Sequence, residues 1–210
     1  MRYLFIIPLV LISLVSLPSW SLSIDDLVDR DGIAYEKFSN IPFNGKVDEG
    51  FDRGTIKDGK RQGLWEIYHS NGQLFIEVNY DNGLEQGPVT VFYQNGRLWK
   101  KGNYKGGVNH GSWLEFHDNG KLMVKGEYKN GIEDGLFERF HKNGQLLYSG
   151  NRKNNMKDGV WRVYFPNGQM MSEGNFKNDK EEGHFIWYNF DGSINVKETG
   201  KFKNGVKVSD

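Results

Sequence analysis

Apolar and polar positions alternate along this chain in short runs bounded by turn residues, and the same order of runs returns every 24 residues. Each unit opens on a glycine, at Gly63, Gly87, Gly111, Gly135, Gly159 and Gly183. A second glycine follows nine positions later, after Asn or Asp, at Gly72, Gly96, Gly120, Gly144, Gly168 and Gly192. A strict period of this length predicts a repeat architecture, in which each unit is one supersecondary element stacked on its neighbours.

Large apolar residues keep fixed places within the unit. Two positions after the opening glycine stand Trp65, Val89, Trp113, Phe137, Trp161 and Phe185. Five positions after it every unit has an aromatic residue: Tyr68, Phe92, Phe116, Phe140, Tyr164 and Tyr188. A third glycine set holds Gly102, Gly126, Gly150 and Gly174, with Val78 in the first unit. Aromatic and β-branched runs between Asn-Gly turns are typical of β-hairpins, so each unit predicts one hairpin.

The predicted fold is therefore all-β: an elongated, single-sheet antiparallel β-meander, or solenoid, of stacked 24-residue β-hairpins. Six repeats and a C-terminal half-repeat are expected in residues 59–210. Residues 22–58 are expected to form an N-terminal cap with degenerate repeats, because the end unit of a solenoid must cover an open face.

The register within each hairpin depends on the turn. A two-residue Asn-Gly loop would pair Trp113 with Gly126, and Trp161 with Gly174, so that each ring covers the glycine opposite it. A three-residue loop with a G1 bulge would change this pairing. Positions two and five also face opposite sides of a regular strand. Either both faces are partly buried or a bulge restores one face, and the sequence leaves these alternatives open.

The first 21 residues have the layout of a secretory signal peptide. Met1-Arg2 carries one charge, residues 3–17 are almost wholly apolar, and small residues precede a predicted cut after Ser21. The alternative is an uncleaved anchor, although the apolar run is shorter than the roughly 18–20 residues that span a bilayer. The leader predicts export, to the periplasm or as a secreted protein. Since the chain has no cysteine, no disulfide or lipidated cysteine is expected there.

Charge and motifs argue against several functional classes. Lys+Arg and Asp+Glu both number 27, so no nucleic-acid partner is expected. His69, His117 and His141 share one position of the repeat, but adjacent repeats lie about 9–10 Å apart, too far to share a zinc ion whose ligands sit at ~2.1 Å. The pairs Glu133-Asp134 and Glu181-Glu182 occupy variable turns typical of solvated loops.

No dinucleotide-binding or nucleophile motif is present in the sequence. The sequence therefore predicts a protein that is not an enzyme, with no catalytic residue, no cofactor and no metal site. The remaining candidate is a binding surface, for which the tryptophans are the most conspicuous residues. Their simpler interpretation is core. If one face of the sheet is uncovered, an exposed aromatic stripe that binds protein or sugar would comprise Trp65, Trp99, Trp113 and Trp161.

Two stretches carry the unit most clearly: "GSWLEFHDNGKLMVKGEYKNG" from Gly111 to Gly131 and "GVWRVYFPNGQMMSEGNFKN" from Gly159 to Asn178. They resemble the MORN repeats, in the variant form common in bacterial proteins. The resemblance covers about residues 57–206 and, more weakly, 32–56. YD repeats and choline-binding wall repeats look similar in places, but the first normally lack this fixed spacing and the second have a shorter period.

The resemblance implies a binding role rather than catalysis. Bacterial relatives are often labelled as antitoxins, and eukaryotic MORN proteins are linked to membrane scaffolding. An antitoxin usually meets its toxin in the cytoplasm, so the predicted export would require a toxin that acts in the envelope. The function predicted here is a non-enzymatic exported scaffold for protein–protein interaction, including an antitoxin-like role, with another protein as partner. The alternative is a module that binds carbohydrate, the cell wall or a membrane surface.

Overall fold

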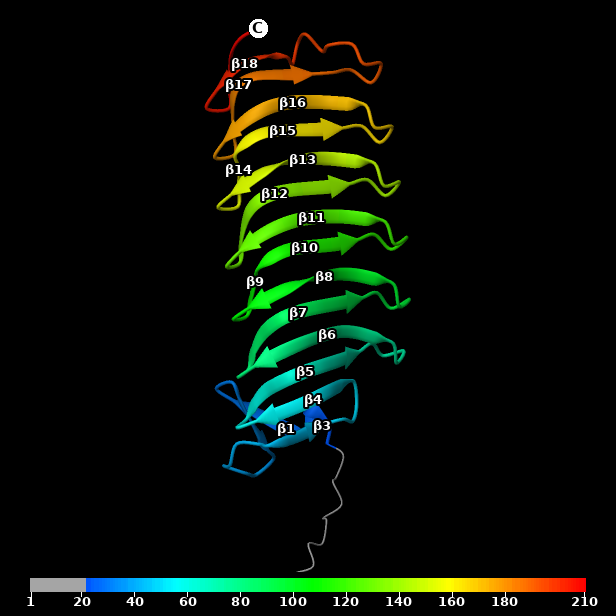
Figure 1. The fold of residues 1–210 in the computed structure, drawn as a ribbon, viewed down its shortest axis with the longest axis vertical. Coiled ribbons are helices and arrows are strands. Elements are labelled where there is room, and N and C mark those ends of the chain that lie inside the picture. The colour runs from blue at the N-terminus through cyan, green and yellow to red at the C-terminus, as the bar shows by residue number, and fades with distance from the viewer. Residues whose placement is uncertain (1–21) are drawn as a thin grey trace, which may run out of the picture.

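The computed structural model describes residues 22–210 and shows a long, open stack of hairpins (Figure 1). The predicted signal peptide, residues 1–21, lies outside the described residues. Within residues 22–210, no helix has the length and hydropathy that crossing a bilayer requires. The predicted all-β meander is confirmed: the described strands form one large antiparallel sheet of 17 strands and a separate two-stranded sheet.

The large sheet runs without crossover from β3 at one end to β19 at the other. Its strands are β3 (Gly45–Val47), β4 (Asp52–Lys57), β5 (Lys60–Tyr68), β6 (Leu74–Asp81), β7 (Leu84–Phe92), β8 (Leu98–Lys105), β9 (Val108–Asn109), β10 (Gly111–Phe116), β11 (Leu122–Lys129), β12 (Ile132–Phe140), β13 (Leu146–Lys153), β14 (Met156–Lys157), β15 (Gly159–Tyr164), β16 (Met170–Lys177), β17 (Lys180–Trp187), β18 (Gly200–Lys203) and β19 (Val206–Ser209).

Two kinds of turn join the strands, one along each of the two long sides of the sheet where the strands end. We call each of these sides an edge of the stack. Between β10 and β11 the loop has three residues and ends on Gly120, whose φ of 85° gives a G1 bulge. His117 N donates to Lys121 O at 2.8 Å across this loop. Between β11 and β12 the loop is the two-residue pair Asn130-Gly131, with positive φ at both residues, as in a type I′ turn.

The predicted pairings of Trp113 with Gly126, and of Trp161 with Gly174, are confirmed, although not by the two-residue loop expected at Asn119-Gly120. The three-residue loop shifts the register by one position. A bulge then shifts it back, because Glu115 pairs with Val124 while Phe116 pairs with Leu122. The two irregularities cancel, so the pairing matches the one that a simple two-residue loop would produce.

The prediction that each ring covers its own hairpin partner is wrong. The indole of Trp113 lies over Gly102 of the preceding hairpin, where an added Cβ would lie only 2.3 Å from Trp113 Cδ2. Gly126 is instead covered by the next hairpin, since its Cβ would meet Phe137 Cε2 at 2.6 Å. The indole leans backwards because its Nε1 donates a hydrogen bond to Asn103 O, also in the preceding hairpin, at 3.2 Å.

The same contact of an indole with a glycine and a carbonyl of the preceding hairpin recurs along the sheet. The indoles of Trp65 and Trp161 lie over Gly54 and Gly150. Their Nε1 groups donate to Thr55 O at 3.1 Å and to Asn151 O at 3.0 Å. The contact between the first and second units uses two medium-sized side chains instead. Val78 stands where the other units have glycine, and Val89 stands opposite it where they have a ring. Ring and glycine, or valine and valine, fill the same space between neighbouring hairpins.

The core is a single file of side chains along the sheet: Val47, Ile56, Trp65, Val78, Val89, Trp113, Phe137, Trp161 and Phe185. Tyrosine rings separate its members. Tyr104 and Tyr128 meet Trp113 edge to face, with centroids 5.2 and 6.2 Å away. Edge-to-face aromatic contacts stabilise the fold beyond the contribution of buried apolar area alone. The repeats therefore hold each other through neighbours rather than through a central core, as expected of a solenoid.

The two ends differ. At the N-terminal end η1 (Ile24–Asp26), β1 (Leu27–Arg30) and β2 (Ile33–Glu36) cover the first strands of the large sheet. Ala34 N donates to Gly59 O at 2.8 Å and Gly59 N to Phe43 O at 2.9 Å, which ties this segment to the β4–β5 turn. At the C-terminal end β19 is the last strand, and Val206 and Val208 are exposed. The boundary between residues 58 and 59 stays a prediction, because β4 and β5 form one hairpin across it.

Candidate binding surfaces

The four tryptophans proposed as a binding stripe do not form one. Trp65, Trp113 and Trp161 expose 0%, 8% and 3% of their surfaces, because each indole packs on the preceding hairpin. Trp99 lies elsewhere, as the unpaired residue of the bulge between Leu98 and Lys100, and it stacks on Tyr93 with ring centroids 5.4 Å apart. Three of the four residues thus stabilise the fold, and the fourth lies at another position of the repeat.

The histidines that share one position of the repeat join neighbouring repeats. Each places Nε2 against a backbone carbonyl of the next hairpin, and the tyrosine at the same position donates its hydroxyl in the same way. The contacts are His69 to Phe92 O at 3.0 Å, His117 to Phe140 O at 3.1 Å, His141 to Tyr164 O at 3.1 Å and Tyr93 to Phe116 O at 2.7 Å. Since a carbonyl only accepts, Nε2 carries the proton in each case.

The turn asparagines continue this inter-repeat bonding. Their side-chain amides donate to carbonyls one repeat on: Asn71 to Gln94 O at 2.9 Å, Asn119 to Lys142 O at 2.8 Å and Asn143 to Pro166 O at 2.7 Å. The edge of the sheet formed by the three-residue turns is therefore a ladder of hydrogen bonds within the protein. The side chains of Asn71, Asn119 and Asn143 therefore join neighbouring hairpins, which makes this side of the sheet a poor candidate for a ligand site.

In one repeat a charged residue replaces the aromatic residue that packs beside the core. Arg152 stands where other units have Tyr or Phe, and its Nε lies 3.0 Å from Glu133 Oε2. Lys157 is its cross-strand partner, with Nζ 4.9 Å from the ring centroid of Trp161. Burial lowers the pKa of Lys157, and the neighbouring charge of Arg152 lowers it further. Glu133 pairs with Arg152, whereas the carboxylates of Asp179 and Glu181 act on Lys157 and partly offset the lowering of its pKa.

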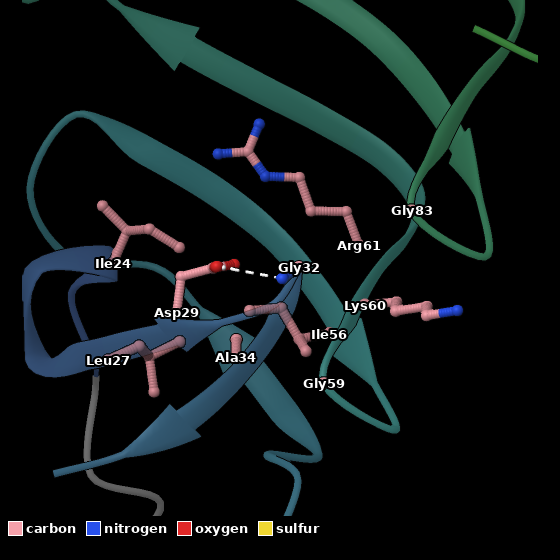
Figure 2. Close-up of a pocket in the computed structure, with 10 residues that line it drawn as sticks. All are labelled: Ile24, Leu27, Asp29, Gly32, Ala34, Ile56, Gly59, Lys60, Arg61 and Gly83. Carbon is pink, nitrogen blue, oxygen red and sulfur yellow. Dashed lines mark hydrogen bonds between the residues drawn. The ribbon is translucent and has the colours of Figure 1, made fainter.

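A pocket of 360 Å³ lies between the N-terminal segment and the first hairpins (Figure 2). Its apolar walls are Ile24, Leu27, Ala34 and Ile56. Two of the three charged side chains that line it, Asp29 and Arg61, have partners within the protein. Asp29 Oδ1 accepts from Gly32 N at 3.0 Å, and the Arg61 guanidinium contacts Tyr80 Oη at 3.2 Å and Asp52 Oδ2 at 3.4 Å. The pocket is thus a gap beneath the cap in which Asp29 and Arg61 already have partners, and its lining residues do not combine a nucleophile with a base.

The edge formed by the two-residue turns is chemically different. Three consecutive turns there join a strand that ends in an exposed lysine to a strand that starts with an apolar residue, and the two residues pair directly across the turn. We call these residues the turn row: Lys105, Val108, Lys129, Ile132, Lys153 and Met156. Directly paired residues project to the same face of a sheet. The row therefore alternates cations and apolar side chains over three consecutive hairpin turns, between the Asp81–Leu84 pair on one side and the Lys177–Lys180 pair on the other.

Sequence reasoning missed the turn row, although its signal was present. A lysine recurs at the same position in the second to fifth repeats: Lys105, Lys129, Lys153 and Lys177. Alone, such a column is consistent with an ordinary solvated face. Only the observed pairing with Val108, Ile132 and Met156 shows that the lysines alternate with apolar residues.

The acidic turns and histidines bring together no metal site among residues 22–210. Glu133 contacts Arg152 and, at 3.4 Å, the hydroxyl of Tyr128. Burial, followed by the charge of Glu133, raises the pKa of Tyr128 to about 12. Packing and ion pairing on the face of the sheet that carries the core residues therefore account for Glu133 and Tyr128.

A family model described as MORN repeat variant matches residues 61–82, 85–105, 109–130, 133–154 and 157–178. Together the five segments cover just over half of the 210 residues. Each segment spans one hairpin and ends in or beside a two-residue turn, so the sequence repeat and the structural repeat coincide. No curated protein matches the chain.

Proposed function

The chain belongs to the MORN repeat variant family, and on that premise we propose that it is an exported, non-enzymatic scaffold that binds another protein. MORN repeats are generally associated with scaffolds that bind proteins or membranes. An antitoxin-like role fits within this proposal where the toxin acts outside the cytoplasm. The proposal specifies the kind of partner and the compartment, beyond the general role of the family.

One observation carries the proposal: the side chains that hold the stack keep their type, whereas those that project from it vary. The packed position two is always apolar, while the neighbouring outward position one changes from unit to unit through Leu64, Pro88, Ser112, Leu136, Val160 and His184. A rigid sheet that presents different side chains at regular spacing suits recognition of an extended protein surface.

A non-enzymatic role is supported by how the polar residues are used. His69, His117 and His141 bond neighbouring hairpins, and Glu133 pairs with Arg152. Export is supported by the predicted leader at residues 1–21 and by the absence of cysteine from the sequence. The carbohydrate alternative loses its motivating feature, because the tryptophan stripe is not exposed.

The test combines location with partner capture in cells that naturally make the protein. The full chain carries a C-terminal tag, and a matched chain that starts at Leu22 after an added methionine serves as the leaderless control. We expect the full chain in the envelope or medium, cut after Ser21 by intact mass, and cross-linked there to one specific protein. An uncut chain that stays in the cytoplasm would contradict export. A chain that cross-links to no protein in either compartment would contradict the scaffold role.

A further inference from the structure

The turn row lies along one edge of the stack, at the left of Figure 1, where β8, β11 and β13 end. Val108 and Ile132 expose 41% and 39% of their surfaces. Apolar side chains left this exposed in a regular line are a feature of interaction surfaces rather than of scattered surface residues.

The lysines of the row, Lys105, Lys129 and Lys153, form no ion pair within the described part of the chain. Lysines elsewhere do pair: Lys100 Nζ lies 2.6 Å from Glu115 Oε1. The row therefore presents positive charge that a partner with carboxylates would complement.

The spacing of the row matches an α-helix laid along it. Strands lie ~4.8 Å apart, so a lysine or an apolar residue recurs about every 9.6 Å. A helix returns to the same face after seven residues, or ~10.5 Å, with an intermediate turn at ~5.4 Å. Apolar residues every seventh position can thus meet Val108, Ile132 and Met156. Carboxylates one turn away can meet the lysines.

We propose that the turn row binds an amphipathic acidic helix of the protein partner, with apolar residues every seventh position and Glu or Asp one turn from each. This inference rests on the proposed function and specifies the partner's chemistry. The observations favour a helix over a membrane surface, because membrane-surface elements present a broad apolar face with Trp, Phe or Leu. The row is a single line of aliphatic residues without an aromatic side chain.

The probe is a synthetic peptide of about four heptads, with Leu at every seventh position and Glu one turn after each Leu. A control peptide has the same composition with its leucines at irregular spacing. Binding to the full chain is measured by fluorescence anisotropy. We expect saturable binding of the probe, weaker binding of the control, and loss of affinity as salt rises from ~50 to ~500 mM.

Two pairs of variants test the location, each pair matched in the type of side chain changed. Lys105→Glu in the row is compared with Lys101→Glu, another exposed lysine of β8. Ile132→Ser is compared with Val196→Ser, an exposed apolar residue of the segment between β17 and β18 that belongs neither to the row nor to position one of the repeat. Each row variant should weaken probe binding about fivefold, and each control variant less than about twofold.

Several results would overturn the proposal. The first is that binding of the probe does not saturate, and the second is that the irregular peptide binds equally well. The third is that row and control variants have equal effects on probe binding. The fourth is that the row binds lipid vesicles. In the last case, row variants would abolish binding to anionic phosphatidylglycerol vesicles and leave the peptide unaffected. The native partner separates this inference from the proposed function. If Lys105→Glu and Ile132→Ser leave the yield of cross-link to it unchanged, the row is wrong and the scaffold role stands.

Discussion

The indole of Trp113 lies over Gly102 of the preceding hairpin and donates its Nε1 hydrogen to Asn103 O at 3.2 Å. This contact crosses from one repeat to the next, so it contributes to the stacking of hairpins rather than to the stability of one hairpin. The stability of a solenoid depends on such nearest-neighbour contacts. The contact also ties the glycine at one position of the repeat to the ring at another.

The first prediction uses the valine pair of the first unit as a template. Gly102→Val should destabilise the protein by about 1–3 kcal/mol, because the new side chain overlaps the indole. The double variant Gly102→Val/Trp113→Val recreates the Val78–Val89 pair and should be more stable than the sum of the two single changes predicts. Urea unfolding followed by circular dichroism measures all four chains. Strict additivity would contradict the proposed coupling.

The second prediction separates two kinds of tryptophan. Trp161→Phe removes the donor to Asn151 O and leaves that carbonyl without its partner, which should cost about 1–3 kcal/mol. Trp99→Phe keeps a ring on Tyr93 and should cost less than about 1 kcal/mol. Thermal melts of the two variants provide the comparison. Equal losses would show that the indole hydrogen bond contributes little.

The sequence was sufficient for the repeat, the hairpins and the pairing of Trp113 with Gly126, because each follows from a period and from turn residues. The sequence did not specify which glycine the indole of Trp113 covers. Trp113 has a glycine opposite it on both sides, Gly102 and Gly126, so the pattern is symmetric where the structure is not. Only the backward lean of the indole toward the carbonyl of Asn103 distinguishes them.

The turn and the bulge illustrate a second limit. The three-residue loop at Gly120 and the bulge at Met123 each shift the register by one, in opposite senses. Their sum equals the simple two-residue loop, so the pairing was predicted correctly from a turn that is not there. The turn row was missed for a related reason. Which face Lys105 shares with Val108 depends on these irregularities and on the type I′ turns, which a repeat period alone does not specify.

The third prediction concerns the histidine position. His117→Ala should lower stability by about 1 kcal/mol, because the carbonyl of Phe140 loses its donor. His117→Tyr should be tolerated, since Tyr93 makes the equivalent bond at 2.7 Å in the preceding unit. Exposed His184, changed to Ala, is the matched control. Thermal melts with and without added zinc complete the test. A rise in melting temperature with zinc that His117→Ala removes would indicate a metal site instead.

The last prediction is a loss of stability in alkali, and it follows from two partly buried tyrosines, Tyr104 and Tyr128. Burial raises the pKa of Tyr104, and burial together with Glu133 raises the pKa of Tyr128 from 10.0 to about 12. A raised pKa means that the folded chain keeps the phenol proton when the unfolded chain has lost it. The stabilisation is therefore complete below pH 10 and disappears as pH rises from 10 towards about 12. Melting temperature against pH, with tyrosinate absorbance recorded in parallel, measures this loss. Tyr128→Phe, which copies Phe176 at the same position of the repeat, should reduce the alkaline loss without changing the fold. An unchanged pH profile for Tyr128→Phe would show that other groups control the transition.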